Sequence, residues 1–236
     1  MNFPTTQWSL LARATLNDHP RGRQALGEFH RKYRSPVVAF LRRRGLPPHD
    51  AEDMAQSFFV HLMEKTTLRR ADATRGRFRS FLLGALVRHL AQARQQEEAA
   101  KRGGGVSPVS LDTVGEVTAE PAVAPAELLA YDRDWAMELL HRALDGVATE
   151  FRQRGREGDF AILRAYLPGA IPPVPTYEES AARLGLGLGA FKTEVHRLRA
   201  RVRELLRREI ATTVSSPEEI DDEVAYLGRV LQSSAP

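Results

Sequence analysis

Residues 176–208 constrain the fold of this chain more than any other part of the sequence, TYEESAARLGLGLGAFKTEVHRLRARVRELLRR. Thr176 and Glu179 have the spacing of a capping box, in which a hydroxyl and a carboxylate satisfy free backbone N–H groups at the start of a helix. Gly185 then supplies a residue that tolerates a positive φ where the chain must turn before a second helix. The pattern predicts a helix-turn-helix over residues 176–203.

The second helix of this motif, which begins near Gly189, separates an apolar face from a basic face. Its apolar residues recur at steps of three and four, so one face packs while the other is available to an anion. In a major groove, the first exposed side chains of such a helix meet base edges, and arginines further along reach phosphates. The candidates for DNA contact are therefore Lys192, Thr193, His196, Arg197, Arg199 and Arg201. The alternative is a basic amphipathic helix whose polar face is simply solvated.

Positive charge gathers in two segments, although the formal net charge of the chain is only +4. Residues 191–208 hold seven Lys or Arg and two acids, and residues 69–102 hold nine and three. Such clusters suit a polyanion, because binding to it releases counterions. The chain has no cysteine, which excludes disulfides and thiolate metal sites. No apolar run approaches the roughly 20 residues of a membrane span, so we expect a cytoplasmic protein without membrane insertion.

Helical periodicity dominates the sequence and strand signals are almost absent, so the predicted fold class is all-α. Residues 103–125 contain three consecutive glycines, three prolines and no basic residue, which is typical of a flexible linker. We therefore predict two small helical domains, residues 1–102 and 126–210, joined by this linker. Residues 211–236 form a C-terminal helical extension that begins with an acidic stretch.

An acidic segment in the first domain, HDAEDMAQSFFVHLMEK, follows two prolines that can end the preceding helix. Asp50 is a suitable helix cap, and Glu52 and Asp53 suit the positive end of the helix dipole. A core helix with a charged first turn explains this pattern, and a partner-binding role for the acids and Gln56 is the alternative. The acids lack the spacing of a metal site, so we predict neither a metal nor another cofactor.

An arginine-rich segment follows, with a basic loop at residues 66–77 and a helix over residues 78–96. Arginines combined with phenylalanines can hold unpaired bases, because aromatic rings stack on bases while cations follow the backbone. The alternative is that both phenylalanines belong to the core. The candidates for DNA contact in this segment are Arg75, Arg77, Phe78, Arg79, Phe81 and Arg88.

Taken in order, the DAEDMAQSFF helix, the RGRFRSFLL segment, the linker and the YEESAARLG…FKTEVHRLRARVREL motif resemble a sigma-70-type factor of the extracytoplasmic-function class. The resemblance covers roughly residues 29–210 and includes the two domains that this family calls region 2 and region 4. It implies a protein that directs bacterial RNA polymerase to promoters and helps to open the DNA. Its partners would be promoter DNA and the clamp and flap of core RNA polymerase.

The resemblance also implies roles for particular residues. Residues 50–62 look like the helix that binds the polymerase clamp, with contacts from Asp50, Glu52, Asp53, Gln56 and Phe59. Residues 66–81 look like the segment that captures the flipped minus-ten base, and residues 192–201 look like the minus-thirty-five recognition helix. Glu194 stands where this family commonly has a basic residue, so we expect a changed promoter sequence.

Two other function classes compete with this interpretation. A helix-turn-helix repressor or activator would explain the C-terminal half and would bind a palindrome as a dimer without polymerase. An interaction module such as an anti-sigma antagonist would carry few basic surfaces of its own. We do not predict an enzyme, because no histidine or serine has the spacing of a paired nucleophile and base.

The C-terminal extension has three interpretations. Its acids fold against the basic region 4 surface and inhibit the protein, its apolar face receives a regulator such as an anti-sigma factor, or it is a small helix that completes the domain. Periodicity puts its acids on the side opposite an apolar face made of Ile220, Val224, Leu227 and Leu231.

Overall fold

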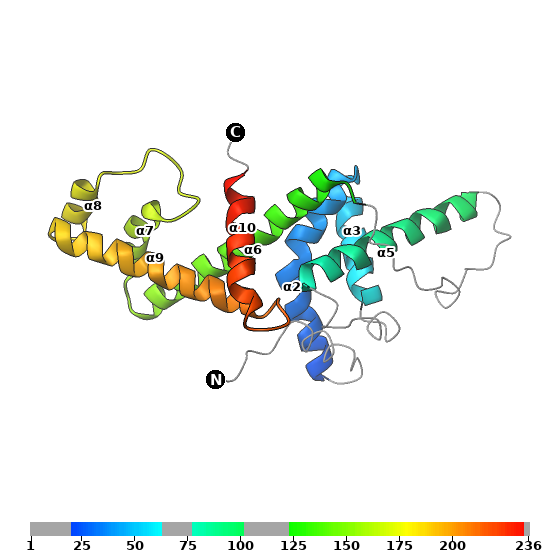
Figure 1. The fold of residues 1–236 in the computed structure, drawn as a ribbon, viewed down its shortest axis with the longest axis horizontal. Coiled ribbons are helices and arrows are strands. Elements are labelled where there is room, and N and C mark those ends of the chain that lie inside the picture. The colour runs from blue at the N-terminus through cyan, green and yellow to red at the C-terminus, as the bar shows by residue number, and fades with distance from the viewer. Residues whose placement is uncertain (1–19, 63–76, 102–122, 234–236) are drawn as a thin grey trace. The chain divides into compact units, whose positions relative to one another are not determined.

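The computed structural model describes residues 20–62, 77–101 and 123–233, and the regular elements in these ranges are all helices (Figure 1). The all-α prediction is therefore confirmed. The predicted loop at residues 66–76 and most of the predicted linker lie outside the described residues. The elements are α2 (Pro20–Arg43), α3 (Pro48–Leu62), α5 (Phe78–Lys101), α6 (Pro125–Gln153), α7 (Glu157–Leu163), the 3-10 helix η3 (Arg164–Tyr166), α8 (Tyr177–Arg183), α9 (Leu188–Ala211) and α10 (Glu219–Gln232).

The chain divides into two compact units. Unit 1 holds residues 1–138 and 212–236, and unit 2 holds residues 139–211. The sequence analysis began the second domain at residue 126 and treated the last residues as a separate extension, so the compact units divide the chain at other positions. The reason is that the first half of α6 and the whole of α10 carry side chains that pack in unit 1.

An aromatic cluster lies at the centre of unit 1. Phe29 of α2 meets Phe59 of α3 and Phe78 of α5 edge-on, with ring centroids 5.9 Å and 5.7 Å apart. Tyr33, one turn further along α2, stacks on Trp135 of α6 with centroids 4.9 Å apart. All five rings are buried. Because burying one such side chain contributes roughly 1.5–3 kcal/mol, the cluster ties α2, α3, α5 and the first half of α6 together.

Ion pairs fasten the first half of α6 to the end of α2. Arg43 and Asp134 approach to 2.6 Å, and the Arg44 guanidinium donates a hydrogen bond of 2.9 Å to Glu127. Tyr131 and Trp135, one turn apart in this half of α6, are also buried. These residues therefore complete unit 1.

α10 packs into unit 1 through a face that differs from the predicted one. The buried residues are Glu223, Leu227 and Val230, which follow the helical steps of four and three. Of the predicted apolar face only Leu227 is fully buried, and Glu223, placed on the solvent side by the sequence analysis, is 1% exposed. That prediction was wrong because the carboxylate meets arginines of unit 1, as the next subsection describes.

The two helices of the predicted helix-turn-helix, α8 and α9, belong to unit 2. Gly185 has a φ of +64° between α8 and α9, which is the left-handed turn that a glycine provides at low cost. Phe191, Val195, Leu198 and Val202 are buried against Val147 and other apolar residues of α6 and α7, as the periodicity predicted. Gly146 of α6 lies so close to α9 that a Cβ there would meet Leu205 Cδ1 at 2.9 Å, so the two helices pack tightly.

Candidate polymerase and nucleic-acid interfaces

α3 presents a polar stripe along one exposed side. Asp50, Asp53, Gln56, Ser57 and Val60 are exposed, whereas Ala55, Phe58 and Phe59 turn into the core. The stripe follows from helical spacing, because steps of three and four keep side chains on one face. Asp50 lies in the first turn of a helix that begins at Pro48, so it is not the cap that the sequence analysis expected.

The two remaining polymerase candidates on α3 lie in different surroundings. Glu52 is half-buried and pairs with Arg34 of α2. Phe59 is 2% exposed and packs edge-on against Phe29 and His30. Phe59 therefore shapes this surface from below through the position of α3, while Asp50, Asp53 and Gln56 reach solvent directly.

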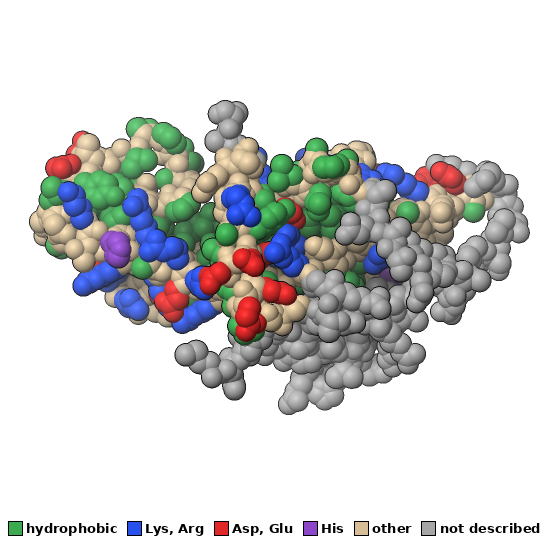
Figure 2. Space-filling model, in the orientation of Figure 1, with side chains coloured by type: hydrophobic (Ala, Val, Ile, Leu, Met, Phe, Trp, Pro, Cys, Tyr) green, Lys and Arg blue, Asp and Glu red, His purple; other side chains and the backbone are tan. Residues whose placement is uncertain are grey.

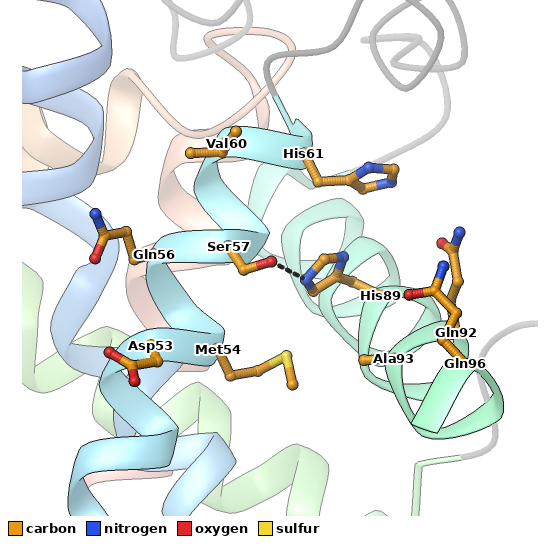
Figure 3. Close-up of a pocket in the computed structure, with 10 residues that line it drawn as sticks. All are labelled: Asp53, Met54, Gln56, Ser57, Val60, His61, His89, Gln92, Ala93 and Gln96. Atoms are coloured by element: carbon orange, nitrogen blue, oxygen red, sulfur yellow. Dashed lines mark hydrogen bonds between the residues drawn. The ribbon is translucent and has the colours of Figure 1, made fainter. Parts of the chain in front are cut away.

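A shallow cavity of about 570 Å³ lies between α3 and α5 (Figure 3). Ser57 Oγ lies 3.2 Å from His89 Nε2, and the His61 and His89 rings stack with centroids 5.1 Å apart. Asp53 and Gln56 point to the side of α3 away from α5. These contacts fix α3 on α5 and leave its acid and amide groups available to a partner.

Val60 is an exposed apolar residue on α3 that the sequence analysis did not name. It lies two turns after Asp53 at the end of the exposed stripe, and it is 59% exposed although it is apolar. An exposed apolar side chain beside polar groups is common at protein interfaces. The sequence signal was available, because Val60 falls outside the apolar periodicity of α3.

The start of α5 brings together several residues predicted to contact DNA, in surroundings that differ sharply. Phe78 is fully buried in the aromatic cluster, and Arg79 is 5% exposed. Phe81 is half-buried and Arg88 is exposed, while Arg75 lies outside the described residues. The side chain of Arg77 is 34% exposed. In this structure, therefore, Arg77, Phe81 and Arg88 reach solvent, and Phe78 and Arg79 do not.

Two carboxylates and an aromatic ring enclose the Arg79 guanidinium. Its Nε donates to Asp132 Oδ1 of α6 at 2.8 Å, and its Nη1 donates to Glu223 Oε1 of α10. The Tyr226 ring lies 4.6 Å from the guanidinium carbon, and the Tyr226 hydroxyl donates to Asp132. Burial lowers the pKa of Arg79, but the two carboxylates more than offset it, so the pKa stays above its ordinary value. Arg79 therefore remains charged and paired.

A tyrosine anchors the helix-turn-helix of unit 2. The Tyr166 hydroxyl lies 2.7 Å from Ser180 Oγ, and it donates to the carbonyls of Pro175 and Thr176, each at 2.9 Å. Thr176 is the N-cap of α8, and the reciprocal bonds of the predicted capping box with Glu179 are both present. The cap prediction is confirmed, and the anchor holds α8 at a defined position before the turn.

The exposed face of α9 carries five of the six residues predicted there for DNA contact. Lys192, Thr193, His196, Arg197 and Arg199 are exposed. Glu194 lies among them and pairs with Arg197 at 3.2 Å and with Arg156 at 3.3 Å. The face therefore combines cations, a hydroxyl and an imidazole with one partly neutralised acid.

Arg201, the sixth residue, has a different environment. Its Nε lies 3.0 Å and 3.1 Å from the two carboxylate oxygens of Glu150 on α6, and its Nη1 donates to Glu204. The hydrogen bond that Arg201 donates to Glu150 lowers the pKa of Glu150 and raises the pKa of Arg201. Arg201 is thus held between two acids inside unit 2.

No candidate metal centre stands out among the described residues. They contain no group of three or more His, Asp or Glu side chains that could hold a metal ion. Of the helices that the structure describes, none combines the length and the apolar character needed to cross a membrane. The surfaces that stand out are the exposed stripe of α3, the start of α5 and the basic face of α9.

Comparison with known families identifies one segment of the chain. Residues 29–98 match the family model described as Sigma-70 region 2. The match spans the end of α2, all of α3 and most of α5, and it supports a sigma factor role in RNA polymerase binding and promoter melting. No curated protein and no solved structure matched the chain.

Proposed function

We propose that this chain, which carries a sigma-70 region 2 segment, is a sigma factor of the extracytoplasmic-function class. It binds core bacterial RNA polymerase and directs transcription initiation at promoters of defined sequence. The observation that carries the proposal is the region 2 match over residues 29–98, since that segment contains the exposed polar stripe of α3. The chain then works with the polymerase in the cytoplasm.

The α3 stripe is the surface we assign to the polymerase clamp. Asp50, Asp53 and Gln56 supply two carboxylates and an amide on one exposed side. Val60 adds an apolar contact at the end of the stripe, and interfaces combine such apolar contacts with polar groups around them. Glu52 and Phe59 hold the stripe in place through Arg34 and the aromatic cluster. Unit 2 would engage the polymerase flap.

Promoter recognition is assigned to two further surfaces. α9 suits duplex DNA at minus thirty-five, because Lys192, Thr193, His196 and Arg197 lie on one exposed face of a long helix after a helix-turn-helix turn. Arg199 is exposed further along the helix and would reach a phosphate, whereas Arg201 would have to leave Glu150 and Glu204 to do so. The segment that leads into α5, with the first turns of that helix, suits melted minus-ten DNA. Arg75, Arg77, Phe81 and Arg88 are the proposed direct contacts. Phe78 is buried and supports them from the aromatic cluster, and Arg79 becomes a contact only when its pairs with Asp132 and Glu223 open.

The proposed function requires binding and positioning, and it places no bond-making step on this chain. RNA synthesis and its metal ions belong to the polymerase. This chain therefore acts without a cofactor of its own, and a separate anti-sigma factor is a further partner that it could accept.

The test is transcription by core RNA polymerase from a pool of templates with randomised upstream DNA. We expect sequence-selective starts when the chain is present and none above background with core polymerase alone. If each template carries a transcribed barcode linked to its upstream sequence, sequencing the transcripts would also reveal the promoter. If selective starts are missing, and the chain binds a palindrome as a dimer without polymerase, the protein is a helix-turn-helix repressor or activator instead.

A further inference from the structure

The contact between α10 and the start of α5 is the feature of this structure that the proposed function leaves unexplained. Glu223 lies in the buried stripe of α10, at a position that an ordinary amphipathic helix fills with an apolar residue. Replacing a buried ion pair by packed apolar side chains is often neutral or stabilising. Packing alone therefore does not explain why an acid stands at this position.

Glu223 meets two arginines that are proposed to contact minus-ten DNA. Its Oε1 accepts a hydrogen bond from Arg79, and its Oε2 lies 3.0 Å from Arg77 Nε. The Tyr226 ring lies near both guanidinium carbons, at 4.6 Å from that of Arg79 and 5.6 Å from that of Arg77. One turn of α10 thus covers both cations.

The charges in this contact balance. Arg77 and Arg79 bring two positive charges, and Glu223 and Asp132 bring two negative charges. A cation neutralised in this way contributes little to the attraction of a phosphate backbone, because binding depends on the charges that replace counterions. The Glu223 carboxylate occupies the place beside Arg77 and Arg79 that a phosphate group would take.

The contact is also incompletely bonded, which favours its release. Although Glu223 Oε2 lies at ion-pair distance from Arg77, it accepts no hydrogen bond from the described residues. A buried carboxylate oxygen without a hydrogen bond carries a desolvation cost. Phe78 N donates to Thr213 O at 3.2 Å, so the chain that leads into α10 also covers the first backbone N–H of α5.

We propose that α10 is an intramolecular inhibitor of minus-ten DNA binding, in which Glu223 and Tyr226 cover Arg77 and Arg79 until nucleic acid phosphate displaces them. This inference rests on the proposed function and names its regulation. It differs from the interpretation in which the acidic extension folds against region 4, because the arginines that its buried acid meets belong to the N-terminal segment.

The first test measures the binding of the full chain to a fluorescent single-stranded DNA of random sequence. Glu223→Gln removes the negative charge, and Asp222→Asn, an exposed acid on the same helix, is the matched control. We expect Glu223→Gln to bind about tenfold more tightly at low salt and the control to bind like the wild type. Each phosphate contact adds about 0.7 to the salt slope on single strands. Asp132 still pairs with Arg79 in this variant, so the one net positive charge that it frees should steepen the slope by about 0.7.

Equal affinities and equal salt slopes for Glu223→Gln and the wild type would overturn the proposal that α10 is an inhibitor. Should Glu223→Gln fail to fold, as judged by circular dichroism, hydrogen exchange on the wild-type chain decides the question. We expect the α10 amides to be protected in the free chain and to lose protection when the single-stranded DNA binds. Unchanged protection at saturating DNA would also overturn the proposal.

Transcription from the randomised template pool separates this inference from the proposed function. If selective starts are equally frequent with the wild type and with Glu223→Gln, the sigma assignment stands and the proposal that α10 is an inhibitor is wrong. No selective starts with either chain, while both bind core polymerase no better than albumin does, would remove the sigma assignment itself. More frequent starts with Glu223→Gln than with Asp222→Asn would support both.

Discussion

Glu150 and Arg201 show at the residue scale how a charged pair stabilises unit 2. Their side chains are 23% and 32% exposed, so water screens the pair only in part. The folded pKa of Glu150 lies below its ordinary value, chiefly because Arg201 donates to it. The pair therefore stabilises the fold above the unfolded pKa of this carboxylate, and that contribution is lost as the pH falls through the folded pKa.

We expect Glu150→Gln to lower the free energy of unfolding by about 1 kcal/mol at pH 7, and we expect this deficit to be smaller at pH 3, because the contribution of the pair is lost as the pH falls through the folded pKa of Glu150. Thermal unfolding followed by circular dichroism at both pH values measures this. Glu157→Gln is the control, since Glu157 and Arg152 lie 3.7 Å apart and are about two-thirds exposed. A deficit of the same size at pH 3 would show that charge is not the cause.

The same scale shows which side chains could be assigned from sequence. Apolar periodicity correctly predicted that Phe191, Val195 and Leu198 are buried, because helical spacing alone determines their face. It could not place Phe78 or Glu223, since each residue's surroundings come from an element far away in the sequence. Phe78 meets α2 and α6, and Glu223 meets α5 across 144 residues.

At the scale of an element, local sequence signals predicted where helices begin better than they predicted which helices pack together. The Thr176 capping box and the Gly185 turn involve residues at most three positions apart, and both were predicted and found. The linker prediction falls outside the described residues for most of its length. The placement of α6 was missed because its two halves belong to different compact units, and one continuous amphipathic pattern carries no sign of that division.

The α8 cap leads to a stability prediction for this element. Thr176→Ala removes the hydroxyl that accepts a hydrogen bond from Glu179 N at 3.2 Å. We therefore expect the free energy of unfolding of unit 2 to fall by about 1 kcal/mol. Thr149→Ala is the matched control, because Thr149 is exposed near the C-terminal end of α6 and its hydroxyl donates to Asp145 O of the same helix. Urea unfolding followed by circular dichroism compares the two. Equal losses would mean that the cap adds no specific stability.

At the scale of the whole molecule, the proposed function separates polymerase binding from promoter binding. Gln56 lies on the exposed stripe of α3, and His196 lies on the exposed face of α9. We expect Gln56→Ala to weaken binding to core polymerase several-fold without changing promoter sequence preference. His196→Ala should keep core binding and lose about 1–3 kcal/mol of discrimination at one base pair.

Fluorescence titration with core polymerase and sequencing of selected transcripts measure these two effects. Asp145→Asn serves as the control for both, since Asp145 is exposed on α6 away from the proposed surfaces. A common loss of both activities in either variant would indicate disturbed folding. If both variants bind core polymerase and select promoters as the wild type does, α3 and α9 do not have the roles proposed for them.

The position of α10 on the same chain has a consequence for gene dosage. α10 and Arg79 belong to the same chain, so the local concentration of α10 beside Arg79 does not depend on expression level. A separate antagonist can be outnumbered when its target is overproduced, whereas a tethered helix keeps a ratio of one to one in every cell. Overproduction would therefore leave the active fraction unchanged, and only a ligand with higher affinity for the released state would raise it.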